Sequence, residues 1–71
     1  MKHPKIIFYE VELVNDNKKH KQIFQLDRYP VKIDYHEIIL VGDYFYRVEE
    51  IYHILEKNEI RIRVSYVGAG S

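Results

Sequence analysis

The sequence predicts an all-β domain, a small and strongly bent antiparallel barrel of five or six short strands. Apolar and aromatic residues alternate with polar ones along several segments, and turn signals separate those segments. The chain has only 71 residues, which makes one small domain. A sheet this short covers its apolar face by bending, and closure also removes exposed strand edges.

Residues 6–14 form the first predicted strand, because they alternate with a period of two and are rich in β-branched and aromatic side chains. Ile7 and Tyr9 lie on the face that we take as inward. Ile6 and Phe8 lie on the opposite face. The outward apolar side chains suggest that this strand is an edge that pairs with another chain.

Residues 15–20 are rich in Asn, Asp and Lys and predict a turn. Residues 21–26 return as a second strand. Its inward side stays open, because Ile23 points one way while Phe24 and Leu26 point the other. Pro30 then interrupts the pattern, since it lacks an N–H and pushes Tyr29 toward an extended conformation.

Residues 31–41 are extended in character and form one bent strand or two short ones. The pair Gly42-Asp43 predicts a two-residue hairpin turn, because glycine accepts the positive φ that such a turn requires. Tyr44 begins the next strand. Residues 55–58 form another turn, and residues 59–67 alternate most clearly of all, with isoleucine and valine on one side and Arg61 and Arg63 on the other.

One segment has two interpretations. Val48, Ile51 and Leu55 also fit the spacing of an amphipathic helix, so the alternative fold is α+β with a helix near 47–57. We favour a strand, because the alternation resumes at Ile51 if Glu49-Glu50 forms a β-bulge. The order of hairpins resembles an SH3-like or Sm-like architecture. We expect residues 1–67 to form the domain and residues 68–71 to be a flexible tail.

The composition argues against several classes of function. Eleven basic residues balance eleven acidic ones, which argues against a general electrostatic grip on nucleic acid. The chain has no cysteine, no long apolar run and no secretory leader pattern, so we expect a cytoplasmic protein without a membrane partner. Its four histidines are far apart in sequence, and Ser65 stands alone on a strand. We therefore expect no metal, no cofactor and no enzymatic activity.

Seven tyrosines are the most suggestive feature. We take Tyr9, Tyr46 and Tyr66 as core residues. The other aromatic residues near turns or on the opposite register predict a protein-binding face, because tyrosine is enriched at interfaces. These candidate residues are Phe8, Tyr29, Tyr35, Tyr44, Phe45 and Tyr52.

The predicted function is a non-enzymatic protein-interaction module that binds a partner protein or forms a homodimer. Its small, cysteine-free and neutral chain also suggests a phage or mobile-element accessory protein that binds a host protein. The alternative is a nucleic-acid-binding barrel that combines basic side chains with stacking tyrosines. The residues of this alternative are Lys18, Lys19, Lys21, Arg61 and Arg63.

Overall fold

The computed structural model describes residues 4–27 and 32–70, in which five β-strands are joined by turns and one short 3-10 helix. The strands are β1 (Lys5–Val14), β2 (Asn17–Leu26), β3 (Ile38–Val41), β4 (Tyr44–Ile54) and β5 (Glu59–Ala69), and the helix is η1 (Leu55–Lys57). The predicted all-β class is confirmed for this part of the chain. The alternative helix near residues 47–57 is wrong, because β4 runs through residue 54 and only the single turn of η1 follows.

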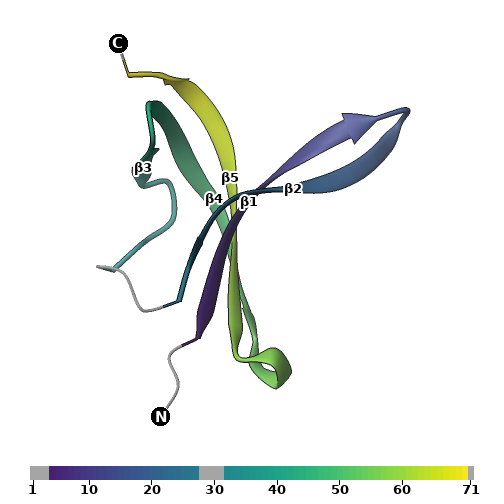
Figure 1. Cartoon of the computed structure of the whole chain (residues 1–71), viewed down its shortest axis with the longest axis vertical. Coiled ribbons are helices and arrows are strands. Elements are labelled where there is room, and N and C mark those ends of the chain that lie inside the picture. Colours follow the sequence, from purple (N-terminus) through teal and green to yellow (C-terminus); the bar gives the residue numbers. More distant parts are fainter. Residues whose placement is uncertain (1–3, 28–31, 71) are drawn as a thin grey trace.

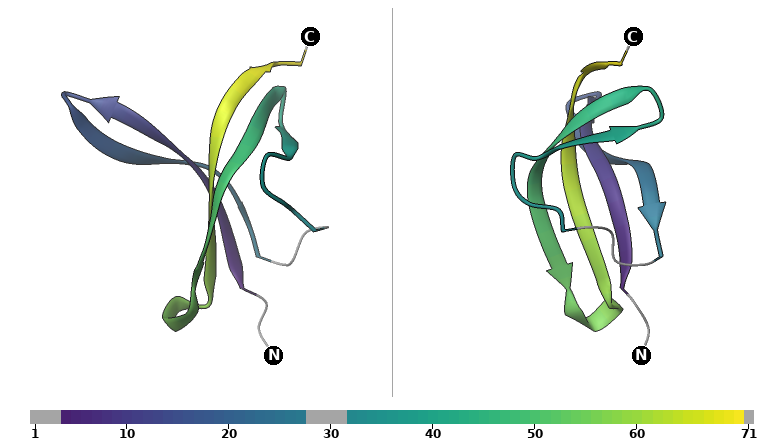
Figure 2. Two further views of the ribbon diagram at one scale, coloured as in Figure 1. Left: turned by 180° about the vertical axis from the view of Figure 1, so that it is seen from behind. Right: turned by 90° about the vertical axis from the view of Figure 1, so that its left-hand side faces the viewer.

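The strands form one sheet in the order β2-β1-β5-β4-β3, as Figures 1 and 2 show. Neighbouring strands are antiparallel except β1 and β5, which run parallel between Lys5 and Tyr9 of β1. Within the described ranges no pairing joins the edge strands β2 and β3. The predicted closed antiparallel barrel is therefore not confirmed. β3 has only four residues, and the outer part of the β1–β2 hairpin turns away from the rest of the sheet (Figure 1).

This hairpin is longer than the sequence predicts. Asn15 and Asp16 have φ angles of 53° and 64°, so the turn needs only these two residues and β2 starts at Asn17. β5 accompanies β1 only as far as Tyr9. The remaining ribbon, residues 10–22, projects from the body and is mostly exposed (Figure 2). We call this ribbon the arm.

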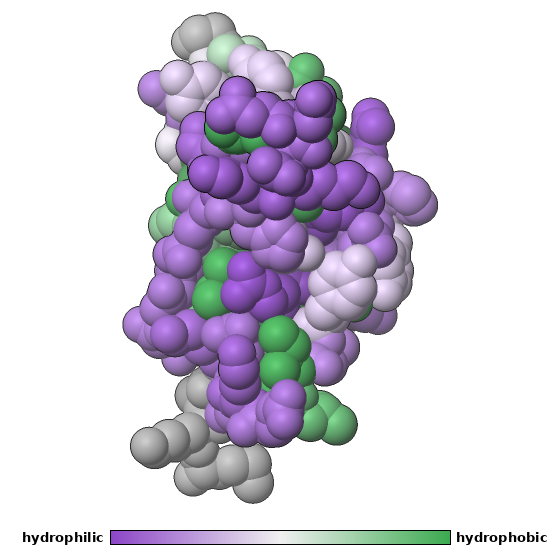
Figure 3. All heavy atoms as spheres, turned by 90° about the vertical axis from the view of Figure 1, so that its right-hand side faces the viewer, coloured by the Kyte–Doolittle hydropathy of each residue, from purple (hydrophilic) through white to green (hydrophobic). Residues whose placement is uncertain are grey.

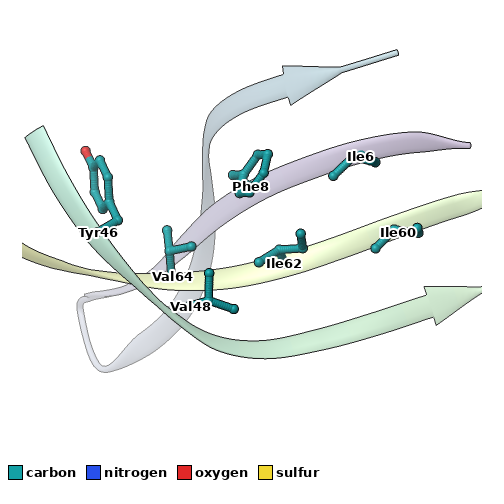
Figure 4. Close-up of a cluster of buried hydrophobic side chains, with 7 residues drawn as sticks. All are labelled: Ile6, Phe8, Tyr46, Val48, Ile60, Ile62 and Val64. Carbon is teal, nitrogen blue, oxygen red and sulfur yellow. The ribbon is translucent and has the colours of Figure 1, made fainter. Parts of the chain in front are cut away.

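The hydrophobic core covers one face of the sheet, and Figure 4 shows seven of its side chains. They come from β1, β4 and β5 and are Ile6, Phe8, Tyr46, Val48, Ile60, Ile62 and Val64. The prediction that Ile6 and Phe8 face outward is wrong, since they are 1% and 2% exposed. Nor is β1 an edge over Lys5–Tyr9, where it lies between β2 and β5. Ile7 and Tyr9 are buried on its other face, so the apolar run of β1 is covered on both sides.

Two β-bulges set which side chains reach this core. Glu49 is an extra residue between the pairs Val48–Val64 and Glu50–Arg63, which confirms the predicted bulge. Ile51 consequently packs against the core, whereas Glu50 points to the opposite face with Tyr52. A second bulge at Ile23 resolves the open question about β2. Ile23 and Leu26 both pack against the core.

The predicted turns at residues 42–43 and 55–58 are confirmed. Gly42 has a φ of 62°, and Asn58 adopts the left-handed conformation that ends η1. Of the extended segment predicted over residues 31–41, residue 31 lies outside the described residues, and the described part is regular only in β3. Before it, the backbone N–H of Glu37 donates to the carbonyl of Asp34 over 3.3 Å and closes a turn.

β5 continues past residue 67, where we expected the domain to end and a tail of residues 68–71 to begin. Gly68 and Ala69 belong to β5 and pair with Phe45 and Tyr44. The N–H of Gly70 then donates to the carbonyl of Asp43 over 2.7 Å. This hydrogen bond ties the end of β5 to the β3–β4 turn. Ser71 lies outside the described residues.

Candidate binding surfaces

Of the six residues predicted to bind protein, the five that the structure describes do not gather into one patch. Phe8 is buried in the core, so its expected exposure is wrong, and Tyr29 lies outside the described residues. Tyr35 is exposed in the turn before β3, while Tyr44 and Phe45 start β4. Tyr52 is exposed near the far end of β4, on the face opposite the core.

Tyr66 also departs from its prediction, because it is 53% exposed although it lies on the core face. Its ring makes edge-to-face contacts with Tyr44 and Tyr46, at centroid distances of 5.9 and 6.0 Å. Tyr46 is buried as predicted, and burial raises the pKa of its hydroxyl. These three tyrosines cover the end of the core nearest the β3–β4 turn.

The two edges of the sheet differ sharply in charge. β2 carries Lys18, Lys19 and Lys21, and charged side chains protect an edge against pairing with other chains. β3 reads Ile-Ile-Leu-Val and has no charge. Its residues Ile38 and Leu40 are 48% and 59% exposed. β3 is therefore an unprotected apolar edge.

An apolar cleft of about 170 Å³ lies beside this edge. Its walls come from β1, β2, β3 and the segment before β3, and its lining residues are Phe8, Phe24, Leu26, Ile33, Ile39, Leu40 and Val41. The cleft therefore connects the side chains of the two edge strands. Its lining contains no charged residue, so it suits apolar side chains.

A second surface is a groove of about 630 Å³ on the opposite face, between the arm and the body of the sheet. Its lining combines aromatic, basic and a few apolar side chains: Tyr9, Val11, Lys18, His20, Glu50, Tyr52, Ile54, Arg61 and Arg63. Figure 3, which looks toward the arm, shows that this side of the molecule is mostly hydrophilic with small separate hydrophobic patches. The groove thus differs in chemistry from the apolar cleft.

Glu50 organises one wall of the groove. Its carboxylate accepts hydrogen bonds from the Tyr52 hydroxyl and from Nε of Arg63, the latter over 2.6 Å. The hydrogen bond from Tyr52 and then that from Arg63 lower the pKa of Glu50. The same hydrogen bond raises the pKa of Tyr52, because it is lost when the hydroxyl ionises. The three side chains therefore hold each other in place at neutral pH.

Tyr9 forms the floor, where the arm meets the body. Its ring stacks with the His20 imidazole at a centroid distance of 4.6 Å, and the Arg61 guanidinium lies 5.0 Å from its centroid. Burial raises the pKa of the Tyr9 hydroxyl, although the charge of Arg61 opposes that shift. Arg61 also forms an ion pair with Glu59 at 3.5 Å.

The structure brings together three of the five residues of the nucleic-acid alternative. Lys18, Arg61 and Arg63 line the groove. Lys19 and Lys21 pair in register with Glu12 and Glu10, so they belong to the other face of the arm. β5 leaves β1 at Tyr9, so Arg61 and Arg63 do not lie opposite Glu10 and Glu12.

Sequence reasoning did not identify β3 as an apolar edge, and it did not place His20 and Glu50 in the groove. The charge contrast between Lys18–Lys21 and Ile38–Val41 was visible in the sequence and could have identified the edge. The positions of His20 and Glu50 beside Tyr9 depend on two bulges and a parallel pairing, which short-range patterns do not specify.

Across residues 4–27 and 32–70, no three His, Asp or Glu side chains gather as metal ligands. In the same ranges there is no helix with the length and apolarity needed to cross a membrane. Comparison of the chain with protein-family models, curated proteins and solved structures gave no match.

Proposed function

We propose that this protein is a non-enzymatic protein-interaction module that binds an extended segment of a partner protein along β3. The observation that supports this most strongly is the difference in charge between the two edge strands, since β2 has three lysines and β3 has none. An apolar, uncharged edge favours addition of another strand, in which main-chain hydrogen bonds supply affinity and side-chain pockets supply specificity.

The register of the β3–β4 hairpin identifies the backbone groups available for this pairing. Val41 and Tyr44 flank the two-residue turn and face each other, as do Ile39 and Tyr46. Hydrogen-bonded and non-hydrogen-bonded pairs alternate in an antiparallel ladder, and the pair that closes the turn is hydrogen-bonded. The N–H and C=O groups of Ile38 and Leu40 therefore point away from β4, toward an incoming strand.

The surroundings of β3 supply contacts for the partner's side chains. The apolar cleft accepts side chains on the core side, and Leu40 is exposed beside Phe45 on β4. Tyr35 is exposed in the turn that precedes β3. An added strand would bring the sheet closer to the barrel that the sequence predicts. Since a cysteine-free chain suits a reducing compartment, we place this interaction in the cytoplasm.

The test is a selection of linear peptides from a random display library on the immobilised protein. We expect the enriched peptides to alternate apolar residues with a period of two, because every second side chain of an added strand faces the cleft. The double substitution Ile38→Lys and Leu40→Lys should abolish their binding. Its matched control places lysine at Leu13 and Leu55, which are 72% and 87% exposed and lie away from β3.

Two results would refute the proposal. One is a library that yields no enriched peptide after repeated rounds. The other is an enriched peptide that binds the Ile38→Lys, Leu40→Lys variant as tightly as the wild type. Loss of binding counts in favour of the proposal only if the variant retains the thermal unfolding transition of the wild type, which shows that the sheet is intact.

A further inference from the structure

We propose that the groove beneath the arm binds a nucleotide unit, with a base stacked on Tyr52 and its phosphate held by Lys18 and Arg61. This inference concerns residues that the β3 interaction does not use. It can therefore hold whether or not the protein-binding proposal does.

Tyr52 provides the stacking platform. Its side chain is 44% exposed, while the hydrogen bond from its hydroxyl to Glu50 fixes the ring. An exposed ring that is already oriented loses little conformational entropy when a base stacks on it. Stacking of this kind is tolerant of base identity and is a recurring feature of single-strand recognition.

Cationic groups lie beside that ring. Arg61 is the register partner of Tyr52 on β5, so the guanidinium and the ring emerge from neighbouring strands on one face of the sheet. Lys18 reaches the groove from the arm on its other side. Arg63 is held by Glu50 through its Nε, so we assign the phosphate to Lys18 and to the guanidinium N–H groups of Arg61 that do not face Glu59. Glu59 lies 3.5 Å from Arg61 and orients the guanidinium from one end.

Charge and size fit this ligand class. Three basic side chains in the lining meet two carboxylates, Glu50 in the lining and Glu59 beside Arg61, so the groove carries a positive excess although the whole chain is neutral. The volume of about 630 Å³ lies within the usual range of small-molecule sites, about 300–1,000 Å³. A divalent cation suits the groove poorly, because its single carboxylate already bonds to Arg63 and Tyr52.

The same chemistry occurs in a free nucleotide and in a single-stranded nucleic acid. The experiment is fluorescence anisotropy with a labelled single-stranded oligonucleotide of about 12 nucleotides, which covers the usual length of one such site. Unlabelled AMP, the duplex form of the oligonucleotide, and poly-glutamate serve as competitors. If AMP competes as well as the unlabelled oligonucleotide at the same total concentration of nucleotides, the groove is a mononucleotide site. Much stronger competition by the unlabelled single strand indicates single-strand recognition.

Matched variants separate the groove from general charge effects. Lys18→Ala should weaken binding, whereas Lys19→Ala, the adjacent lysine on the opposite face of the arm, should not. Tyr52→Ala should weaken binding by about tenfold or more. Tyr44→Ala, which removes a similarly exposed tyrosine on the other face of β4, should leave it unchanged. Affinity should fall as salt rises, and Lys18→Ala should make that dependence shallower by about 0.7 in the logarithmic slope.

The inference is overturned if neither AMP nor the oligonucleotide binds. It is also overturned if Tyr52→Ala binds like the wild type, or if Lys18→Ala and Lys19→Ala weaken binding equally. Competition by poly-glutamate as strong as that by the oligonucleotide would instead identify the groove as a surface for acidic peptides. Wild-type thermal unfolding of each variant excludes loss of fold as the cause of any loss of binding.

Discussion

Arg63 and Glu50 face each other across β4 and β5, and Nε of Arg63 donates a hydrogen bond to the Glu50 carboxylate over 2.6 Å. This contact exists because Glu49 is an extra residue in β4. Without the bulge, the alternation after Val48 would place Glu50 on the core face. One inserted residue therefore both completes the core and builds a wall of the groove.

The hydrogen bond from Tyr52 is the largest cause of the lowered pKa of Glu50. We expect Tyr52→Phe to raise the Glu50 pKa toward its ordinary value of 4.5. An NMR titration of the side-chain carboxyl carbons measures this pKa directly. Tyr44→Phe is the control, because Tyr44 lies on the other face of β4, and it should leave the titration unchanged. An unaltered Glu50 titration in Tyr52→Phe would contradict the hydrogen bond.

The same shift makes stability depend on pH. The pKa of Glu50 is lower in the folded chain than its ordinary value of 4.5, so the folded state disfavours protonation. The stabilisation from this carboxylate is fully present above that pH and is lost as the pH falls through the folded-state pKa. The difference in unfolding free energy between the wild type and Glu50→Gln should therefore shrink below about pH 4.5. Urea unfolding at several pH values tests it, and a constant difference would contradict this account.

Substitution by alanine should affect stability differently at Gly42, in the β3–β4 turn, and at Gly68, in β5. Gly42→Ala should destabilise the fold by about 1 kcal/mol, because its φ of 62° strains any residue with a Cβ, although no atom lies in the way. Gly68→Ala meets no atom either and has no such φ. It should be neutral or stabilising by about 0.4–1 kcal/mol, since it restricts the unfolded chain. Thermal unfolding measures both, and equal shifts would argue against the predicted turn geometry.

The core should be sensitive to the loss of one methyl group. Ile62 is 3% exposed at the centre of β5, so Ile62→Val should cost about 0.5–1.5 kcal/mol of unfolding free energy. This small change is preferable to alanine in a chain of 71 residues, whose stability is marginal. Leu55→Ala is the control, because Leu55 is 87% exposed, and it should shift stability by less than about 0.5 kcal/mol.

The arm should open more readily than the body of the sheet. Beyond Tyr9 it has two strands and few buried side chains, and an isolated two-stranded hairpin is marginally stable in water. Backbone amides at residues 17–21 should therefore exchange with solvent faster than the paired amides near Val48 and Val64. Hydrogen exchange followed by NMR gives these rates. Equal protection in the arm and the body would show that further contacts support the arm.

Local patterns were sufficient for β1, β4 and β5 and for the turns at residues 42–43 and 55–58. The alternation in residues 59–67 and the glycine at position 42 act over a few residues, and β5 and the β3–β4 turn follow them. The same patterns also identified the bulge at Glu49, because strand propensity and alternation could agree only with one extra residue.

Longer-range pairing was beyond these patterns. The parallel alignment of β1 with β5 pairs residues that are 54 positions apart, such as Lys5 with Glu59, and it places Ile6–Tyr9 inside the sheet, where both faces are covered. Phe8 was consequently assigned to the surface, although it belongs to the core. The groove also requires this alignment, since it brings Tyr9 beside Arg61.

Amide hydrogen exchange at Ile38 and Leu40 tests the central claim, that β3 is an open edge for a partner strand, most directly. In the isolated monomer these two amides should exchange rapidly, while Ile39 and Val41, which face β4 residues in hydrogen-bonded pairs, should be protected. Addition of a peptide enriched on the protein should then protect Ile38 and Leu40. Protection of both amides before any peptide is added, or rapid exchange that the bound peptide leaves unchanged, would contradict the claim.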